Sequence, residues 1–257
     1  MEKRPVGARR HLAFDDVAST NLVALEAARS GDPGPLWVTA AVQTAGRGRR
    51  GRVWQSERGN LYATLLLLDP APDSEITNLP LVVALGVRNG LATLPGVDPD
   101  RVRIKWPNDV MVDGAKLVGI LLESETVAPG RRAVVIGCGV NVELDFAGAA
   151  YPTTTLRSQG FKGTIDDVFS ALASGVEAAL EIWSSGRQFQ VIRREWIRHS
   201  IGKGEPCRVT LPSGEAIEGR FADLDADGRL ILEREGGERR VFSAGDLFFL
   251  RSASAVP

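Results

Sequence analysis

Two strongly apolar segments of the sequence enclose a loop built only from four arginines and three glycines. The apolar segments are LWVTAAV at 36–42 and LYATLLLL at 61–68, and the loop reads GRGRRGR at 46–52. Short apolar runs of this kind are typical of buried strands, so both ends of the loop are tied to a core. Its glycines give the backbone freedom, and its arginines repel one another. We therefore expect a loop that orders only when an anion draws its guanidinium and N–H groups together.

Further strands and helices follow along the first two hundred residues. Strands are predicted at 102–106, 110–112, 116–123 and 133–142. Helices are predicted from Asn21, from Pro80, from Thr164 and around 189–199. Ser19-Thr20 and Thr164 are the expected helix caps, and Asp113-Gly114 predicts a tight hairpin turn.

The pattern of the sequence changes after Ile201. Short alternating runs are separated there by Ser-Gly, Asp-Gly and Gly-Gly turns. This pattern predicts a meander of about five strands, consistent with a small β-barrel. We therefore expect a larger domain at 1–203 and a barrel at 204–257.

The charge balance limits the class of partner. The whole chain has a formal net charge of −1, and residues 204–257 carry seven Lys and Arg against ten Asp and Glu, which leaves the barrel at −3. Oligonucleotide binding depends on cationic contacts with phosphate, so the barrel has the wrong sign for it. The arginine loop alone could still be a solvated or nucleic-acid-binding segment. A nucleic-acid-binding module is therefore the alternative from a different functional class.

Several features favour a cytoplasmic protein with no membrane partner. Cys138 and Cys207 have no second cysteine or histidine at metal-ligand spacing, and two lone thiols fit a reducing compartment. The first residues lack the apolar run of a signal peptide. The longest apolar stretch, at 61–68, is far too short to span a bilayer.

KWPND at 105–109 ends a strand in a turn that presents two polar side chains. Asn108 can hydrogen-bond a phosphate or a ribose, and Asp109 can hold Mg²⁺ or orient an amine. Both can equally serve only local hydrogen bonds within the turn. Lys116 stands at the mouth of the following hairpin, where an ammonium group can pair with a phosphoryl oxygen.

Two further motifs are weak signals by themselves. Trp54, directly after the arginine loop, offers a flat face for an adenine or simply fills the core. GCGVN at 137–141 closes a strand with two glycines that allow a ligand to approach closely, and its Asn141 can read a base edge.

In this order the motifs resemble those of biotin protein ligases, and the resemblance covers essentially the whole chain. The matching pieces are STN (19–21), Gln43 with TAGRGRRGRVW (44–54), NLY (60–62), KWPNDV (105–110), KLVGILLE (116–123) and GCGVN (137–141). The resemblance implies an α+β fold with a mixed sheet backed by helices, related to class II synthetases and lipoate ligases. An SH3-like barrel would follow. Cys138 departs from the small or aliphatic residue common in the family.

The resemblance also implies a set of site residues. Biotin would be bound by Ser19, Thr20, Asn21, Gln43, Arg47, Gly48, Arg49 and Lys116. ATP would be bound by Arg49, Trp54, Asn108, Lys116 and Asn141. Lys116, Arg47, Arg49 and Asp109 would act in catalysis, and Asp109 would be the candidate ligand of Mg²⁺.

The implied reaction uses ATP and Mg²⁺ to activate biotin. The acceptor would be the biotin carboxyl carrier domain of an acetyl-CoA or acyl-CoA carboxylase. We expect a monomer or weak homodimer with no specific nucleic acid. Family members that repress transcription carry a winged-helix domain before the STN motif, where fewer than twenty residues stand here, so a ligase without repressor function is expected. A lipoate or octanoate ligase is the alternative enzyme, but Ser19 and Gln43 would then have no ureido ring to bind.

Overall fold

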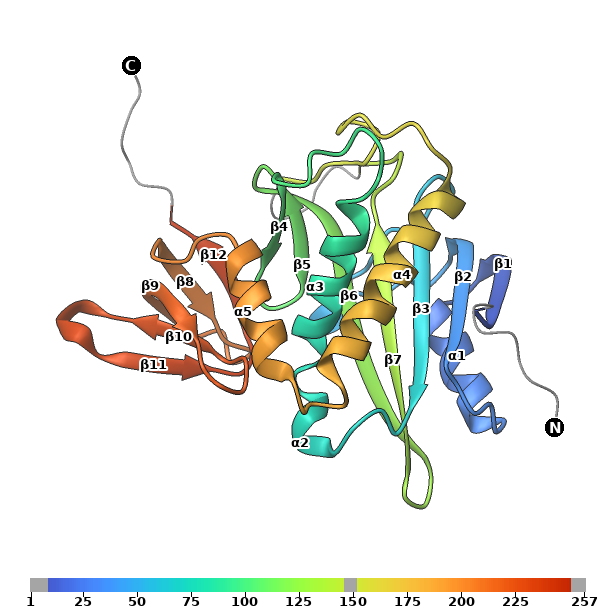
Figure 1. Cartoon of the computed structure of the whole chain (residues 1–257), viewed down its shortest axis with the longest axis horizontal. Helices are drawn as coiled ribbons and strands as arrows, with labels where there is room; N and C mark the ends of the chain where they lie inside the picture. The colour runs from blue at the N-terminus through green and yellow to red at the C-terminus, as the bar shows by residue number, and fades with distance from the viewer. Residues whose placement is uncertain (1–8, 146–151, 251–257) are drawn as a thin grey trace. The chain divides into compact units, whose positions relative to one another are not determined.

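The computed structural model describes residues 9–145 and 152–250 (Figure 1). The chain forms two compact units. The first unit consists of residues 1–70 and 117–169, and the second consists of residues 71–116 and 170–257. Strand β6 (Ala115–Ala128) and helix α4 (Ile165–Trp183) each run from one unit into the other. The expected boundary near Lys203 lies within the second unit and stays a prediction.

The sheet of the first unit is mixed, as the resemblance implied. Its strands are β1 (His11–Val17), β2 (Leu36–Gln43), β3 (Leu61–Leu68), β7 (Arg131–Val140) and β6, and they lie in the order β1-β2-β3-β7-β6. β1 runs parallel to β2, and the remaining pairs are antiparallel. The sequence did not predict β1, because almost all of its side chains are exposed and show no buried face.

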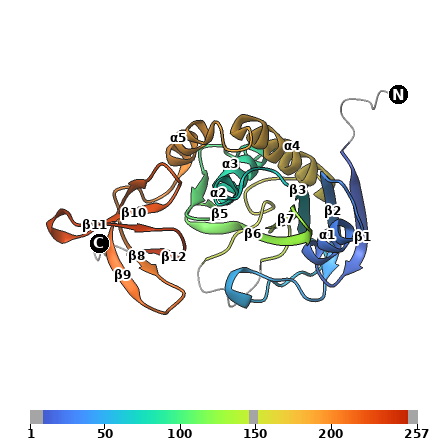
Figure 2. The ribbon, with the colours of Figure 1, turned by 90° about the horizontal axis from the view of Figure 1, so that it is seen from below.

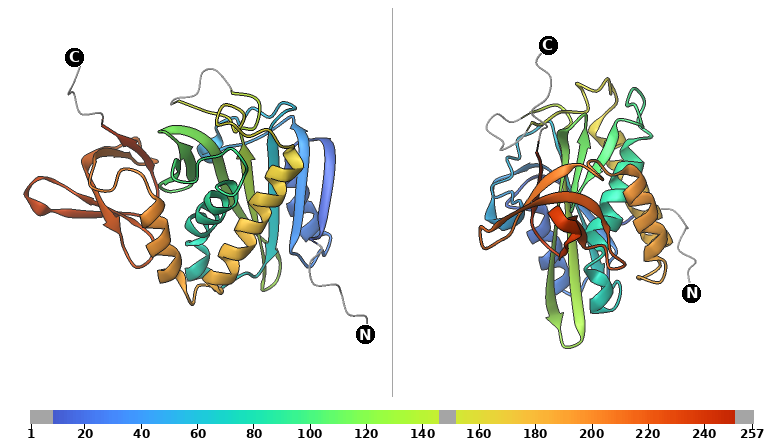
Figure 3. Two further views of the ribbon diagram at one scale, coloured as in Figure 1. Left: turned by 45° about the horizontal axis from the view of Figure 1, so that its top comes forward. Right: turned by 90° about the vertical axis from the view of Figure 1, so that its left-hand side faces the viewer.

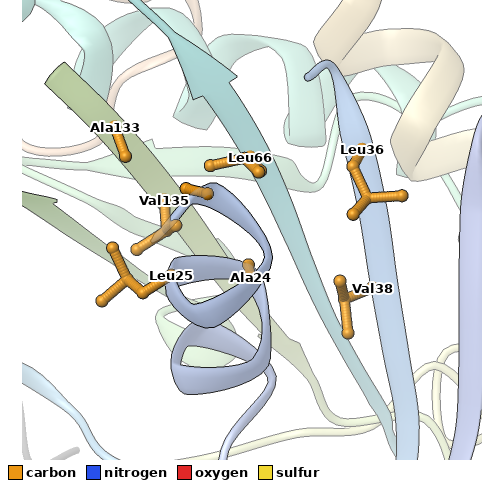
Figure 4. Close-up of a cluster of buried hydrophobic side chains, with 8 residues drawn as sticks. Ala24, Leu25, Leu36, Val38, Leu66, Ala133 and Val135 are labelled. Carbon is orange, nitrogen blue, oxygen red and sulfur yellow. The ribbon is translucent and has the colours of Figure 1, made fainter. Parts of the chain in front are cut away.

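Helix α1 (Thr20–Arg29) covers one face of this sheet and closes a small core (Figure 4). Ala24 and Leu25 of the helix pack against Leu36, Val38 and neighbouring residues of β3 and β7. The predicted helix is confirmed, and its N-cap residue falls within the predicted Ser19-Thr20 pair. Ser19 occupies the N-cap position without a side-chain hydrogen bond to the helix.

The second unit begins with helices and a short hairpin. Its elements are α2 (Asp73–Ile76), α3 (Leu79–Leu91), β4 (Val102–Lys105), β5 (Asp109–Val112) and α5 (Phe189–His199). α3 packs against α5, and both views of Figure 3 place the two helices side by side. Pro80 lies in the first turn of α3 as predicted. Thr164 caps α4 as predicted, because its hydroxyl accepts the Asp167 N–H at 3.1 Å while Asp167 accepts the Thr164 N–H at 2.8 Å.

The C-terminal sheet contains the five predicted strands. They are β8 (Pro206–Thr210), β9 (Ala216–Leu224), β10 (Leu230–Glu233), β11 (Arg239–Phe242) and β12 (Asp246–Phe249). All pairs are antiparallel in the order β11-β10-β9-β8-β12, and the β10–β11 hairpin extends from the other strands (Figure 2). Across residues 9–145 and 152–250, no helix has both the length and the apolar character needed to cross a bilayer.

The crossing of α3 and α4 in the second unit depends on small residues. A Cβ atom on Gly90 of α3 would lie 2.1 Å from the Ala171 carbonyl oxygen of α4, and one on Gly175 would lie 2.2 Å from the Gly86 carbonyl oxygen. Both distances are below any real van der Waals contact, and the blocking atoms belong to the backbone. The helices therefore meet at a separation that only glycine permits.

We predict that Gly90→Ala lowers the free energy of unfolding by about 1–3 kcal/mol, the usual cost of overpacking a core. In an unobstructed helix the same change would stabilise, by up to about 1 kcal/mol. Asn89→Ala is the matched control, since Asn89 is the exposed neighbour on α3. Urea denaturation measures both variants, and a Gly90→Ala protein as stable as wild type would contradict the close crossing.

Candidate functional site

Three of the predicted site residues form a hydrogen-bonded network with Thr64 in the first unit. They are Thr20, Asn21 and Gln43. The Thr20 N–H donates to Gln43 Oε1 at 2.9 Å, and the Thr20 hydroxyl lies 3.1 Å from the same oxygen. The Thr64 hydroxyl lies 2.7 Å from Thr20 Oγ1 and donates to Asn21 Oδ1, also at 2.7 Å. Thr64 is fully buried in β3, and Thr20 and Asn21 are almost fully buried in the first turn of α1.

The network continues at Asn21 toward the arginine loop. Asn21 Nδ2 donates to Glu123 Oε2 at 2.7 Å. The guanidinium of Arg47 lies 3.2 Å from Glu123 Oε1 and 3.3 Å from Oε2. Glu123 is the last residue of the KLVGILLE motif, so β6 supplies one carboxylate that both α1 and the loop contact.

At the opposite end, the network reaches the residues that follow the loop. Gln43 Nε2 donates to Ser56 Oγ at 3.0 Å, and the Ser56 hydroxyl donates to the Trp54 carbonyl oxygen at 2.9 Å. A Cβ atom on Gly46 would lie 2.4 Å from that carbonyl oxygen and 2.5 Å from Ser56 Oγ. The first loop glycine is therefore required by this close approach.

The two glycines of GCGVN make room for site side chains. A Cβ on Gly137 would lie 2.5 Å from Asn21 Oδ1, and one on Gly139 would lie 2.4 Å from Trp54 Nε1. The sequence predicted that these glycines admit a ligand. What approaches them in the structure is the Asn21 amide and the Trp54 indole, so Trp54 packs directly on β7.

The arginine loop has little regular structure of its own. Arg49–Gly51 form one turn of 3-10 helix in which Arg50 has a φ of 59°. The Gly48 N–H donates to the Arg52 carbonyl at 2.7 Å, and Arg47 and Val53 form an isolated bridge. The loop is thus closed on itself at its base, while Arg47 contacts Glu123.

Asn60, from the NLY motif, orders the chain after β7. Its Oδ1 accepts the N–H groups of Val142, Glu143 and Leu144 at 2.8–3.0 Å. Asn141, the residue before Val142, is buried and donates its N–H to the Leu117 carbonyl at 3.0 Å. Asn60 therefore fixes the backbone that presents Asn141.

The second unit holds Asn108, Asp109 and Lys116. Lys116 Nζ lies 2.7 Å from Asp109 Oδ1, and the two side chains are only 11% and 12% exposed. Asn108 is also buried. Asp113 and Gly114 both have positive φ, as a two-residue hairpin turn requires, and they place Lys116 at the start of β6 as predicted.

The cysteines are poor nucleophiles. Both are buried free thiols, and burial raises the pKa of Cys138 to about 12 and that of Cys207 to about 11. Each thiol therefore stays protonated near neutral pH. Among the described residues, no three His, Cys, Asp or Glu side chains cluster as a metal site would require.

Three contributors to the network were missed by sequence reasoning: Ser56, Thr64 and Glu123. Thr64 is the one residue of LYATLLLL besides Tyr62 that carries a hydroxyl, and a hydroxyl in an apolar strand needs a partner when buried. That signal could have identified it. Glu123 gave a weaker signal, since a charged residue at the end of an apolar strand is usually solvated.

Family models match both parts of the chain. Residues 14–141 match the biotin/lipoate A/B protein ligase family, and residues 203–250 match the biotin protein ligase C terminal domain. The biotin–[acetyl-CoA-carboxylase] ligase of Paracoccus denitrificans is 38% identical over 90% of this chain and 97% of its own length. The bifunctional ligase/repressor BirA of Bacillus spizizenii is 33% identical over 91% of this chain and 73% of its own length.

A solved structure supports the same fold. The biotin protein ligase from Aquifex aeolicus, in complex with biotin and ATP, superposes with a TM-score of 0.79. That match covers 95% of this chain and 100% of the other at 24% identity. The chain therefore belongs to the biotin/lipoate A/B protein ligase family, and within it to the biotin protein ligases, whose C-terminal domain it also carries.

Proposed function

We propose that this chain activates biotin with ATP to biotinyl-5′-AMP and transfers the biotinyl group to a lysine of a biotin carboxyl carrier domain. The observation that carries the proposal is the 38% identity to the Paracoccus denitrificans ligase, which extends over 90% of this chain. The match of residues 203–250 to the biotin protein ligase C terminal domain favours biotin over lipoate as the substrate. The carrier domain of acetyl-CoA or acyl-CoA carboxylase is the proposed acceptor.

The chemistry needs no nucleophile from the protein. In the first step a carboxylate oxygen of biotin attacks the α-phosphorus of ATP, and pyrophosphate leaves. In the second step the carrier lysine amine attacks the acyl carbon of the anhydride, AMP leaves, and the amine loses a proton. Both steps depend on aligned reactants and on cations that stabilise phosphoryl charge.

Lys116 is the cation that we assign to the reacting phosphoryl group. Its ammonium and the Asp109 carboxylate are 2.7 Å apart and nearly nine-tenths buried. A buried ion pair holds its members in a fixed geometry, because separating them would leave an uncompensated charge. Asp109 therefore orients Lys116, and Asn108 beside it is proposed to bind the nucleotide.

Magnesium is expected to enter with the nucleotide. Mg²⁺ is usually held by one or two carboxylates together with substrate phosphates, and Asp109 is the carboxylate proposed for that contact. When bound, the ion would neutralise charge on the phosphoryl oxygens. The pairing of Asp109 with Lys116 makes orientation of the lysine its first role.

The first unit supplies the proposed biotin site. Ser19, Thr20, Asn21 and Gln43 are short or amide side chains that suit a ureido ring, which has two N–H donors and a strong acceptor. Arg47, Gly48 and Arg49 are proposed to close over the substrate anions and exclude water from the anhydride. Trp54 and Asn141 are proposed to contact the adenylate.

The proposed activity is tested by biotin-dependent exchange of labelled pyrophosphate into ATP. Exchange with biotin that lipoate does not replace would support the proposal. Exchange with lipoate alone would identify a lipoate ligase instead. Absence of exchange, together with a gel shift of nucleic acid that persists at moderate salt, would favour the binding-module alternative.

We predict that Lys116→Ala reduces pyrophosphate exchange by about 100-fold or more, as for other preorganised groups that stabilise transition-state charge. Asp109→Asn should reduce it by less, because the lysine remains. Lys162→Ala is the matched control, since Lys162 is an exposed lysine of the chain. Near-normal exchange in Lys116→Ala would remove this lysine from the site.

We predict that Arg49→Gly releases the reactive intermediate. The change removes a guanidinium group and adds backbone freedom, and both effects favour the open loop. Adenylation should continue at a reduced level, while the escaped biotinyl-AMP acylates exposed lysines of a bystander such as serum albumin. The measurement is bystander biotinylation at matched formation of the intermediate.

Arg50→Gly is the control for this prediction. It removes the same charge from the same loop, and its φ of 59° accepts glycine without strain. If Arg49→Gly and Arg50→Gly label albumin equally, retention of the intermediate is not a property of Arg49.

A further inference from the structure

Glu123 joins two parts of the proposed biotin site, yet the family resemblance assigned it no role. Its carboxylate accepts the Asn21 Nδ2–H at 2.7 Å and pairs with Arg47 at 3.2 Å. The Glu123 side chain is 30% exposed and Asn21 is only 4% exposed, so the Asn21 contact lies on the buried side.

The charge on Glu123 fixes the direction of the hydrogen bonds made by the Asn21 amide, and through them the direction of the Thr64 hydroxyl. An ionised carboxylate only accepts, so Asn21 must turn Nδ2 toward it and Oδ1 toward Thr64. Thr64 has one hydroxyl hydrogen, and Asn21 Oδ1 requires it. The Thr64 hydroxyl also lies 2.7 Å from Thr20 Oγ1, but its single hydrogen is directed to Asn21, and the Thr20 hydroxyl donates to Gln43 Oε1 at 3.1 Å. Thr20 Oγ1 keeps its lone pairs free to accept an N–H from a ligand.

A neutral group at position 123 would permit the reverse order. A glutamine amide can donate to Asn21 Oδ1, which allows Asn21 Nδ2 to donate to Thr64. Thr64 would then donate to Thr20, and Thr20 would donate to Gln43 Oε1, which lies 3.1 Å away. Both orders satisfy all these groups, so only the charge at Glu123 selects one of them.

The second contact of Glu123 acts on the loop. Arg47 is the first arginine of GRGRRGR, and Glu123 holds it at the edge of the network. The loop carries several cations and no acidic residue, so a carboxylate from β6 offsets their mutual repulsion. Glu123 thus orients the hydrogen bonds of Asn21 and Thr64, and it also holds the arginine loop through Arg47.

We propose that Glu123 is a positioning residue that sets the hydrogen-bond polarity of Thr20, Asn21 and Thr64 and anchors the loop through Arg47. The proposal rests on the proposed function, because biotin is the ligand that would hydrogen-bond with these donors and acceptors. It extends that function by naming the group that keeps the site in a single donor and acceptor pattern.

Three variants separate the two roles. Glu123→Gln keeps size and hydrogen-bonding ability but removes the charge. Thr64→Val removes the hydroxyl that relays the polarity and leaves the Glu123–Arg47 pair intact. Glu125→Gln is the matched control, because Glu125 lies two residues along β6 and pairs with Arg29 of α1 at 2.6 Å without reaching the loop.

Two measurements are made on the full chain: biotin binding by calorimetry, and the rate of trypsin cleavage at residues 47–52 without ligand. Glu123→Gln should weaken biotin binding about tenfold, the usual effect of losing a charge-assisted hydrogen bond, and should also speed cleavage several-fold. Thr64→Val should weaken binding and leave cleavage unchanged. Glu125→Gln should match wild type in both. Thermal unfolding of all three variants separates these effects from a general loss of stability.

Equal biotin affinity in Glu123→Gln and Glu125→Gln would overturn the polarity role, and equal cleavage would overturn the anchoring role. If Glu123→Gln fails to fold, Thr64→Val alone decides the polarity role, and Arg47→Gln decides the anchoring role by its cleavage rate. If wild-type protein does not bind biotin, the proposed function fails, while the cleavage comparison still decides whether Glu123 holds the loop.

Discussion

The first unit is organised around the need to satisfy polar groups inside an apolar sheet. Thr20, Asn21 and Thr64 are buried among aliphatic strands, where an unpaired hydroxyl or amide would cost about 1–3 kcal/mol. Each of these groups finds its partner within the network, which ends at the charged Glu123. The close approach of the Asn21 amide to β7 in turn requires glycine at 137. A single polar network therefore fixes residues in a helix, three strands and a loop.

The same network provides a negative charge next to the strongly cationic arginine loop, although the protein as a whole has almost no net charge. Arg47 is held by the Glu123 carboxylate, and the loop base is closed by the Gly48–Arg52 hydrogen bond. In the proposed reaction, Arg47 and Arg49 close over the substrate anions. One loop arginine is thus paired within the protein, and another is proposed to contact substrate. This arrangement fits a reaction in which the substrates supply the nucleophiles and the protein supplies cations and alignment.

Much of the fold follows from local sequence patterns. Apolar runs identified β2, β3 and β7, proline and threonine marked the starts of α3 and α4, and Asp113-Gly114 marked the β5–β6 turn. These features are encoded within a few neighbouring residues. β1 was missed because its side chains are exposed. Ser19 is the N-cap residue but makes no side-chain hydrogen bond to the helix, because a capping residue type does not guarantee a capping bond.

The sequence by itself determined the family, the identity of the motif residues and the order of the main elements, because these depend on residue type and local spacing. Only the tertiary structure decided that Asp109 pairs with Lys116, that the GCGVN glycines admit Asn21 and Trp54, and that Thr64 and Glu123 complete the network. Glu123 is 102 positions from Asn21 and 76 from Arg47 along the chain. Contacts at such separation arise from strand pairing and helix packing over the whole sheet, so no local pattern can specify them.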